Sequence, residues 1–328
     1  KKIRKILDAM DEDTKPKELH KNVNDKTKLL IYVLKEKHKN ESFWKPYLDI
    51  LPENFSSPMF WTPEELDWLQ GSHVKEAAKR EKSEIQKQYY LLREHVFAAD
   101  RKTFPKKSFS QKEWMWATAL YDSRVIQLNR GTGTNVPTFT PLIDMVNCKE
   151  SSDRSFIYFN PETRTADMFA DRPVKLGEQV FETYGNKSNY EYLLYNGFVM
   201  EDNPNQCVYV EFPPPQGNVP GARSMSFCLG PDDIPRQVKF WARHAMMHRM
   251  SSESEAGEVI KHLEAHLHRY DMTQVQDDER ILSEQGQDLG MHKMMALQMR
   301  IHEKRSLALT IQRLKSGEIP CCKVTPGK

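Results

Sequence analysis

The feature of this sequence that most limits its possible folds is a block of short β-type segments between two helical regions. An apolar and aromatic run at 156–159 is followed by a polar turn at 160–163 and a second extended run at 164–169, which is the pattern of a β-hairpin. Further β-type runs cover 179–183 and 208–212. Charged segments with helical periodicity precede and follow the block. This order predicts an α+β fold and not a doubly wound sheet.

Helix-start signals mark several helices on either side of the block. The segments 62–65 and 110–113 each carry the Ser/Thr-x-x-Glu pattern of a capping box, and Pro63 suits the first helical position. The aromatic patch at 43–48 is expected to pack at a helix end, since aromatic side chains bury large areas. Helices are expected over 1–40, 73–98, 110–124, 236–250, 255–268 and a long stretch through Met294, Ile301 and Leu314.

The length, charge and hydropathy of the chain exclude other function classes. With 328 residues, the chain is long enough for two domains and a sizeable core. Its formal net charge of +2 gives no general attraction to nucleic acids or acidic membranes, so no direct nucleic-acid binding is predicted. No apolar run approaches the ~20 residues that a membrane span requires. We therefore expect a globular protein without a membrane span.

Cysteine usage predicts a reducing environment and free thiols. The five cysteines are odd in number and scattered in spacing, which argues against a disulfide framework. They are Cys148, Cys207, Cys228, Cys321 and Cys322. Free thiols are typical of intracellular proteins, which favours the cytoplasm or the nucleus without excluding an organelle.

The common motifs that bind phosphates or metals do not occur in the sequence. There is no glycine-rich phosphate loop and no G-x-G-x-x-G pattern, which argues against the usual nucleotide-phosphate chemistry. Two pairs of histidines lie one helical turn apart, and they are His244 with His248 and His262 with His266. No acidic or thiol partner recurs beside them at ligand spacing, so these histidines are predicted to pack or to lie at the surface, and no metal site is predicted.

The segment 141–148 is one candidate for chemistry. It places Asp144 and Asn147 among apolar residues, and buried polar groups need partners. Arg124 lies upstream, at the end of the tryptophan-rich helix. From the residues alone, a capped turn explains Asp144 and Asn147, and a surface ion pair explains Arg124.

The segment 177–199 is the second candidate. A β-type run leads into Tyr184-Gly185, and an aromatic helical segment follows and stops at Asn196-Gly197. A tyrosine hydroxyl can steer an amine towards a reacting group without adding a competing nucleophile. The alternative is a buried structural tyrosine with a satisfied hydroxyl.

These segments resemble, in order, the motifs of SET-domain protein methyltransferases in the branch of the Rubisco large-subunit lysine methyltransferase and the actin-histidine methyltransferase. The resemblance implies a SET β-core with a helical insertion, followed by an all-α C-terminal substrate-binding domain. It also implies a protein substrate or a protein complex as partner. The division that follows is an N-terminal helical segment at 1–42, the insertion at 43–122, the SET core at 123–212 and the helical domain at 213–328.

The resemblance also implies roles for single residues. Tyr184 would be catalytic and position the acceptor amine. S-adenosylmethionine (AdoMet) would be the cofactor, held by Arg124, Asp144, Asn147, Cys148, Asn196 and Phe198. Ile126 and Ile143 stand where the histidine-methylating branch has an asparagine and a tryptophan, so the acceptor pocket is expected to suit lysine.

The sequence departs from the family pattern at two places. Asn147-Cys148 stands where the family usually has Asn-His, and no glycine precedes Gly71, although the family has an N-terminal Gly-x-Gly turn that approaches the cofactor closely. The predicted function is an AdoMet-dependent protein-lysine N-methyltransferase acting on a non-histone or histone protein. The alternatives are a catalytically decayed SET-fold scaffold or subunit of a larger assembly, and a protein-histidine N-methyltransferase.

Overall fold

The chain packs as two compact units. The first consists of Lys1–Met59 and Lys79–Gly185, and the second of Phe60–Ala78 and Asn186–Lys328. The computed structural model describes residues 23–131, 133–149, 157–170, 172–214, 224–231, 234–249, 254–270, 275–285 and 288–319. Residues 1–22 of the helical region predicted over 1–40 and the cysteines Cys321 and Cys322 therefore lie outside the described residues.

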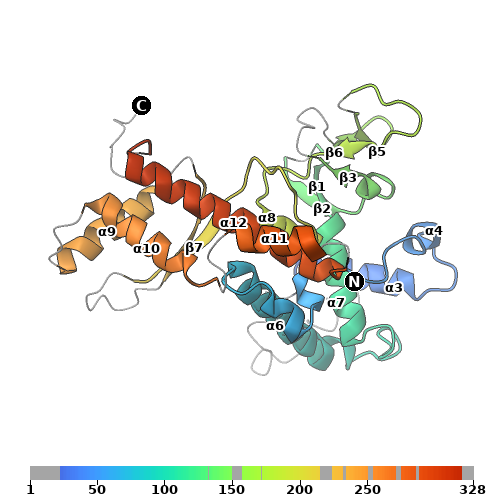
Figure 1. The fold of residues 1–328 in the computed structure, drawn as a ribbon. Helices are drawn as coiled ribbons and strands as arrows, with labels where there is room; N and C mark the ends of the chain where they lie inside the picture. Colours follow the sequence, from blue (N-terminus) through green and yellow to red (C-terminus); the bar gives the residue numbers. More distant parts are fainter. Residues whose placement is uncertain are drawn as a thin grey trace. The chain divides into compact units, whose positions relative to one another are not determined.

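Two helices of the first unit pack on each other, α3 (Asp25–Lys37) and α7 (Gln111–Arg124) (Figure 1). The Ser110 hydroxyl caps α7 as predicted, because its oxygen accepts a hydrogen bond from the Glu113 N–H. The Glu113 carboxylate accepts instead from Lys37 Nζ at 2.9 Å. The Ser110 half of the predicted capping box is therefore present, whereas the Glu113 side chain joins α7 to the end of α3.

The long charged helix predicted at 73–98 is confirmed. α6 covers His73–Leu92 and continues as a π-helical turn, η2, over Arg93–Phe97. Phe97 is fully buried and starts an aromatic core in which the ring centroids lie 5.1–6.0 Å apart. The members of this core are Phe97, Phe104, Phe109 and Trp114.

The aromatic patch at 43–48 does not pack as expected. The short helix α4 covers Lys45–Leu48 and buries none of its residues, and Phe43 is 83% exposed. The Phe43 ring contacts the edge of Trp44, whose indole N–H donates to the Tyr32 hydroxyl at 2.8 Å. The expectation was wrong for Phe43 and Trp44, whose rings contact each other and Tyr32 instead of filling a core.

The strands of the first unit form three short pairs. The hairpin predicted around the turn at 160–163 is confirmed by an antiparallel pair, β4 with β5. A second antiparallel pair joins β1 to β2, and a parallel pair joins β3 to β6, which is the centre of the strand predicted at 179–183. The strands are β1 (Ile126–Asn129), β2 (Asn135–Thr138), β3 (Asn147–Cys148), β4 (Ile157–Asn160), β5 (Thr165–Met168) and β6 (Phe181–Glu182).

The second unit combines one hairpin with helices. The strand predicted at 208–212 is confirmed as β7 (Val208–Phe212), and its exposure alternates with period two, as expected for a half-buried strand. It pairs antiparallel with β8 (Met225–Leu229), which the sequence did not predict. The helices are α5 (Pro63–Asp67), α8 (Asn189–Glu191), α9 (Arg236–Arg249), α10 (Glu255–Leu267), α11 (Val275–Gln285) and α12 (Met291–Ser316).

The capping box predicted at 62–65 is complete. Thr62 Oγ1 accepts from the Glu65 N–H, and the Glu65 carboxylate accepts from the Thr62 N–H.

None of the helices in the described part of the chain combines the length and the apolar character needed to cross a membrane.

Buried ions join α11 to α12, which lie side by side (Figure 1). The carboxylate of Asp278 contacts Lys304 Nζ at 2.7 Å and Arg300 Nη2 at 3.1 Å. All three residues are at least 98% buried. Burial lowers the pKa of Lys304, and the Asp278 hydrogen bond and charge oppose this shift. Because isolated buried charges are costly, each of these residues depends on the others.

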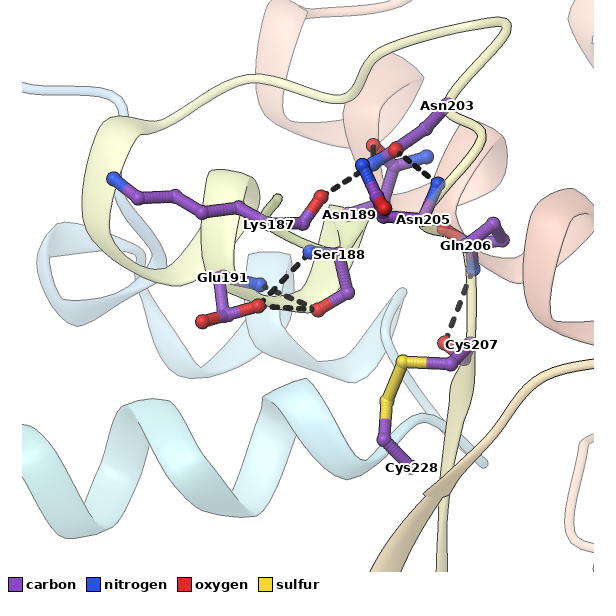
Figure 2. Close-up of a disulfide and its surroundings, with 9 residues drawn as sticks. All are labelled: Lys187, Ser188, Asn189, Glu191, Asn203, Asn205, Gln206, Cys207 and Cys228. Carbon is purple, nitrogen blue, oxygen red and sulfur yellow. Dashed lines mark hydrogen bonds between the residues drawn. A yellow bond between two sulfur atoms is a disulfide. The ribbon is translucent and has the colours of Figure 1, made fainter. Parts of the chain in front are cut away.

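Cys207 and Cys228 form a disulfide, contrary to the expectation of free thiols (Figure 2). Their Cα atoms lie 5.3 Å apart, although the two residues are separated by 21 positions in the sequence. The β7–β8 pairing brings them together, and spacing arguments could not find the bond because β8 was not predicted. Cys148 is free. The prediction of a reducing compartment rested on free thiols, and the disulfide between Cys207 and Cys228 does not support it.

Candidate active site

The parallel pairing of β3 with β6 places the two candidate segments side by side. Asn147 lies opposite Phe181 and Cys148 lies opposite Glu182, and the Lys149 N–H donates to the Glu182 carbonyl oxygen at 3.0 Å. Segment 141–148 thereby runs along the strand that leads to Tyr184. Segment 141–148 and the start of segment 177–199 thus form one polar centre in the first unit.

Tyr184 is anchored across this pairing. Its hydroxyl donates to the Val146 carbonyl oxygen at 2.8 Å. Burial raises the pKa of Tyr184 to about 12, and the charges of Glu182 and Cys148 push it in the same direction. The phenol therefore stays protonated at neutral pH. A phenol that donates one hydrogen bond keeps acceptor capacity on its oxygen, so Tyr184 can still receive an N–H.

Asp144 occupies the buried side of the same centre. It lies in the 3₁₀ turn η3 (Ile143–Met145) and is 7% exposed. The Tyr47 hydroxyl donates to its Oδ2, while Arg124 Nη1 donates to its backbone carbonyl at 2.7 Å and lies 3.8 Å from its Oδ2. Burial raises the pKa of Asp144, and the hydrogen bond from Tyr47 and the charge of Arg124 offset this shift in part.

The backbone beside Asp144 is strained. Leu142 has φ +77° and ψ −45°, a conformation that non-glycine residues rarely adopt, and its side chain is 73% exposed. Strain of this kind costs about 1–3 kcal/mol and concentrates at functional sites. The turn that presents Asp144 is therefore held by its surroundings and not by the preference of its own residues.

The centre contains buried polar atoms that fit a polar ligand. Arg124 Nε and Asp144 Oδ1 are buried and make no hydrogen bond within the described residues. A buried polar atom without a partner costs about 1–3 kcal/mol. A donor and an acceptor of this kind in one centre match the charged amino-acid portion of AdoMet, which carries both an ammonium and a carboxylate.

Glu182 is the member of this centre that the sequence did not identify. Its side chain is 4% exposed, and it lies on β6 two residues before Tyr184. Burial, together with the charge of Asp144, raises the pKa of Glu182 to about 7. The missed signal is a single acidic residue inside a β-type run that leads to a candidate catalytic tyrosine.

The remaining predicted residues of the first unit surround the centre less tightly. Asn147 is exposed on β3 and Cys148 is half-buried. The apolar neighbours of Asn147 in the sequence suggested that it is buried and needs hydrogen-bond partners, but it is exposed. Ile126 begins β1 and Ile143 begins η3, and both are half-buried.

Asn196 and Phe198 belong to the second unit, where a capped turn positions them. Ser188 and Glu191 form a complete capping box at the start of α8, which runs on into the π-helical turn η4 (Tyr192–Asn196). Gly197 ends this segment with φ +76°, a conformation that glycine adopts without strain. The Phe198 ring stacks on Tyr192 with centroids 4.8 Å apart.

A buried amide fixes the loop that follows. Asn189 is fully buried, donates from Nδ2 to the Met200 carbonyl at 2.8 Å and accepts from the Met200 N–H at 3.0 Å. Asn203 Nδ2 donates to the Lys187 carbonyl and to Asn189 Oδ1, and Figure 2 shows both bonds beside the disulfide. This network ties the start of α8 to the loop that leads to Cys207 and β7.

His262 and His266 pack within the second unit, as predicted for this pair, whereas the side chain of His248 lies outside the described part of the structure. His262 Nε2 contacts the Glu211 carbonyl oxygen at 2.9 Å, and its ring stacks on Phe212. His266 is 3% exposed, and burial lowers its pKa to about 4. Among the described residues no group of three or more His, Cys, Asp or Glu side chains is arranged to hold a metal ion.

Solved structures share this fold. No family model matches the sequence. The chain superposes on the SET domain of LSMT bound to lysine and AdoHcy with a TM-score of 0.75 and 18% identity, covering 97% of this chain and 80% of that chain. Rubisco LSMT bound to AdoMet gives a TM-score of 0.73 and 19% identity, covering 97% and 78%. The chain therefore has the fold of a SET domain followed by a helical C-terminal region, and the predicted fold class is confirmed.

Curated sequences add the relatives. Over 190 residues the chain is 30% identical to the chloroplastic [fructose-bisphosphate aldolase]-lysine N-methyltransferase of Arabidopsis thaliana, which is 55% of this chain and 38% of that protein. Over 188 residues it is 26% identical to the actin-histidine N-methyltransferase of Homo sapiens, at 56% and 31%. The chain is thus similar to SET-domain methyltransferases of this branch, as its motifs indicated. It spans about a third of the length of these relatives.

Proposed function

We propose that the chain carries the acceptor side of an AdoMet-dependent protein-lysine N-methyltransferase site. The observation that carries the proposal is the hydrogen bond from Tyr184 to Val146, which fixes the tyrosine where segment 141–148 meets β6. The relatives that methylate lysine or histidine in other proteins support the reaction class. A protein is accordingly the expected substrate.

In the first unit, four residues are proposed to hold AdoMet. Arg124 and Asp144 supply the buried donor and acceptor, and Asn147 and Cys148 continue along β3. For Asn196 and Phe198, a cofactor-binding role is what the resemblance implies. When bound, AdoMet supplies an activated methyl group on a sulfonium. The protein supplies orientation and electrostatic stabilisation, which account for most of the catalysis in such transfers.

The proposed role of Tyr184 follows from its protonation state. The phenol is protonated at neutral pH and donates to Val146, so its oxygen can accept an N–H from the acceptor amine and aim the nitrogen lone pair. Tyr184 is therefore a positioning group for the amine and not the group that removes its proton.

Lysine is the proposed acceptor. Ile126 and Ile143 are apolar, so neither can hydrogen-bond an imidazole, whereas both can line the alkyl stem of a lysine. Replacing Ile126 by Asn and Ile143 by Trp should shift activity towards histidine-containing peptides. Mass spectrometry of the methylated residues measures the shift, and a wild-type product methylated on histidine would contradict the lysine proposal.

The test of the proposed function is binding followed by transfer. Titration calorimetry should show that the protein binds AdoMet, and tritium should pass from labelled AdoMet to lysine-containing peptides. Tyr184→Phe should retain AdoMet binding and lose transfer. A wild-type protein that binds no AdoMet would instead support the non-catalytic scaffold alternative.

A further inference from the structure

A lysine acceptor must lose a proton before it can be methylated, and Tyr184 does not take it. With an ordinary lysine pKa of about 10.4, roughly one amine in 2,500 is neutral at pH 7. The buried phenol of Tyr184 is itself protonated at this pH. If the proposed function holds, another group of the centre must accept this proton.

Glu182 is placed to be that group. The residue is 96% buried on β6, two residues before Tyr184. It lies opposite Cys148 in the β3–β6 pairing, and the hydrogen bond from Tyr184 to Val146 spans the same two segments. The charge of Glu182 also helps to raise the pKa of the Tyr184 phenol. Within the described residues, the hydrogen bond to Glu182 reaches its backbone carbonyl, from Lys149, and none reaches its carboxyl group.

The groups that face Glu182 come from each element packed around it. They are Asp144 from η3, Cys148 opposite it on β3, Tyr184 after β6, and, through Asp144, Tyr47 from α4 and Arg124 from α7. The one cation among them, Arg124, donates to the Asp144 backbone and lies beside the Asp144 carboxylate. No described cation forms an ion pair with Glu182, so its carboxyl remains available to an incoming one.

We propose that the carboxylate of Glu182 accepts the proton of the acceptor lysine, while Tyr184 holds the nitrogen. In this step an N–H bond breaks, the nitrogen keeps the electron pair, and an O–H bond forms on Glu182. The nitrogen then forms its bond to the methyl carbon while the carbon–sulfur bond breaks and its electron pair goes to sulfur. The product is a methylated ammonium, and Glu182 returns its proton to solvent.

The proton affinity of Glu182 suits this role. A general base is most effective when its pKa lies near the working pH, because it is then both available and basic. Burial and the neighbouring Asp144 place the pKa of Glu182 at about 7, well above that of an exposed glutamate. The same burial leaves the carboxylate poorly solvated, so a lysine ammonium is a favourable partner for it.

The first test follows the carboxyl group itself and needs no substrate. In protein labelled with ¹³C at the glutamate side-chain carboxyl, one resonance should titrate with a midpoint near pH 7. It should disappear in Glu182→Gln and persist in the control Glu178→Gln, which removes an exposed glutamate paired with Arg172. Glu303 is also buried with its pKa raised to about 7, so loss of the specific Glu182 resonance is the criterion. A Glu182 resonance that titrates below pH 5.5 would overturn the inference.

The second test is the pH profile of transfer to a library of lysine-containing peptides. Glu182→Gln should lower kcat/KM at pH 7 by about 10²–10⁴-fold. The loss should shrink towards pH 10, where solvent deprotonates the amine, and AdoMet affinity should not change. A variant whose rate falls equally at every pH has a structural defect only, and this result would overturn the inference.

The two proposals fail differently. A wild-type protein that does not bind AdoMet overturns the proposed function, and this inference with it. A wild-type protein that binds AdoMet but methylates no library peptide overturns the lysine assignment. Normal wild-type transfer with an unchanged pH profile in Glu182→Gln overturns the role of Glu182 alone.

Discussion

Replacing Glu182 with glutamine should stabilise the protein at alkaline pH and not at acid pH. Burial moves the pKa of Glu182 from 4.5 to about 7, and each pKa unit corresponds to about 1.4 kcal/mol. The difference of about 2.5 units gives a penalty of about 3 kcal/mol for holding the ionised carboxylate in the folded state. The pKa is raised in the folded state, so the full stability is present below pH 4.5 and is lost as pH rises to 7. Glutamine carries no charge, so the variant does not lose this part of its free energy of unfolding as pH rises.

Urea denaturation at pH 4.5 and pH 8 measures this effect. Glu182→Gln and the wild type should have similar free energies of unfolding at pH 4.5, and the variant should exceed the wild type by up to about 3 kcal/mol at pH 8. Glu178→Gln is the control, because Glu178 is exposed and its pKa is lowered by the hydrogen bond from Arg172. A difference between Glu182→Gln and wild type that is the same at both pH values would refute the assignment of a buried, destabilised carboxylate.

Three further changes test other parts of the structure. Leu142→Gly should raise the free energy of unfolding by about 1 kcal/mol in thermal denaturation, because glycine adopts the positive φ of this residue without strain and the lost side chain is exposed; a destabilised variant would contradict this. Reducing the bond between Cys207 and Cys228 should lower the free energy of unfolding by about 3 kcal/mol, and dithiothreitol should have no effect on the melting temperature of a Cys228→Ser variant. Asp278→Ala should cost about 3–5 kcal/mol because it leaves Lys304 and a neighbouring arginine buried without a counter-ion, whereas a cost below 1 kcal/mol would show that the pair is dispensable.

Local signals in the sequence predicted the local structure. The Thr62–Glu65 capping box, the Ser110 cap and the β4–β5 hairpin each depend on residues within a few positions of one another. These interactions are local and do not depend on the rest of the chain, so the spacing of the residues is sufficient to predict them. The β7 strand was found for a similar reason, since its alternation of buried and exposed side chains is a property of the strand itself.

Non-local pairings were not predictable in the same way. The β3–β6 ladder is two residues long on each strand, and it joins segments that no local pattern connects. The pKa of Glu182 is raised by burial and by the charge of Asp144, which is distant in the sequence, and Cys207 meets Cys228 because β7 pairs with β8. Resemblance to a family supplied Tyr184 and Arg124 as candidates, but only the packed structure shows that Arg124 holds the backbone of Asp144.

The central claim is that this chain carries a methyl-transfer site built around Tyr184. The most direct measurement is AdoMet binding by calorimetry, combined with tritium transfer to lysine-containing peptides, for the wild type and Tyr184→Phe. The account predicts that both proteins bind AdoMet with similar affinity and that the variant transfers methyl groups at least ~10²-fold more slowly. Transfer at the wild-type rate by Tyr184→Phe, or a wild type that binds no AdoMet, would contradict it.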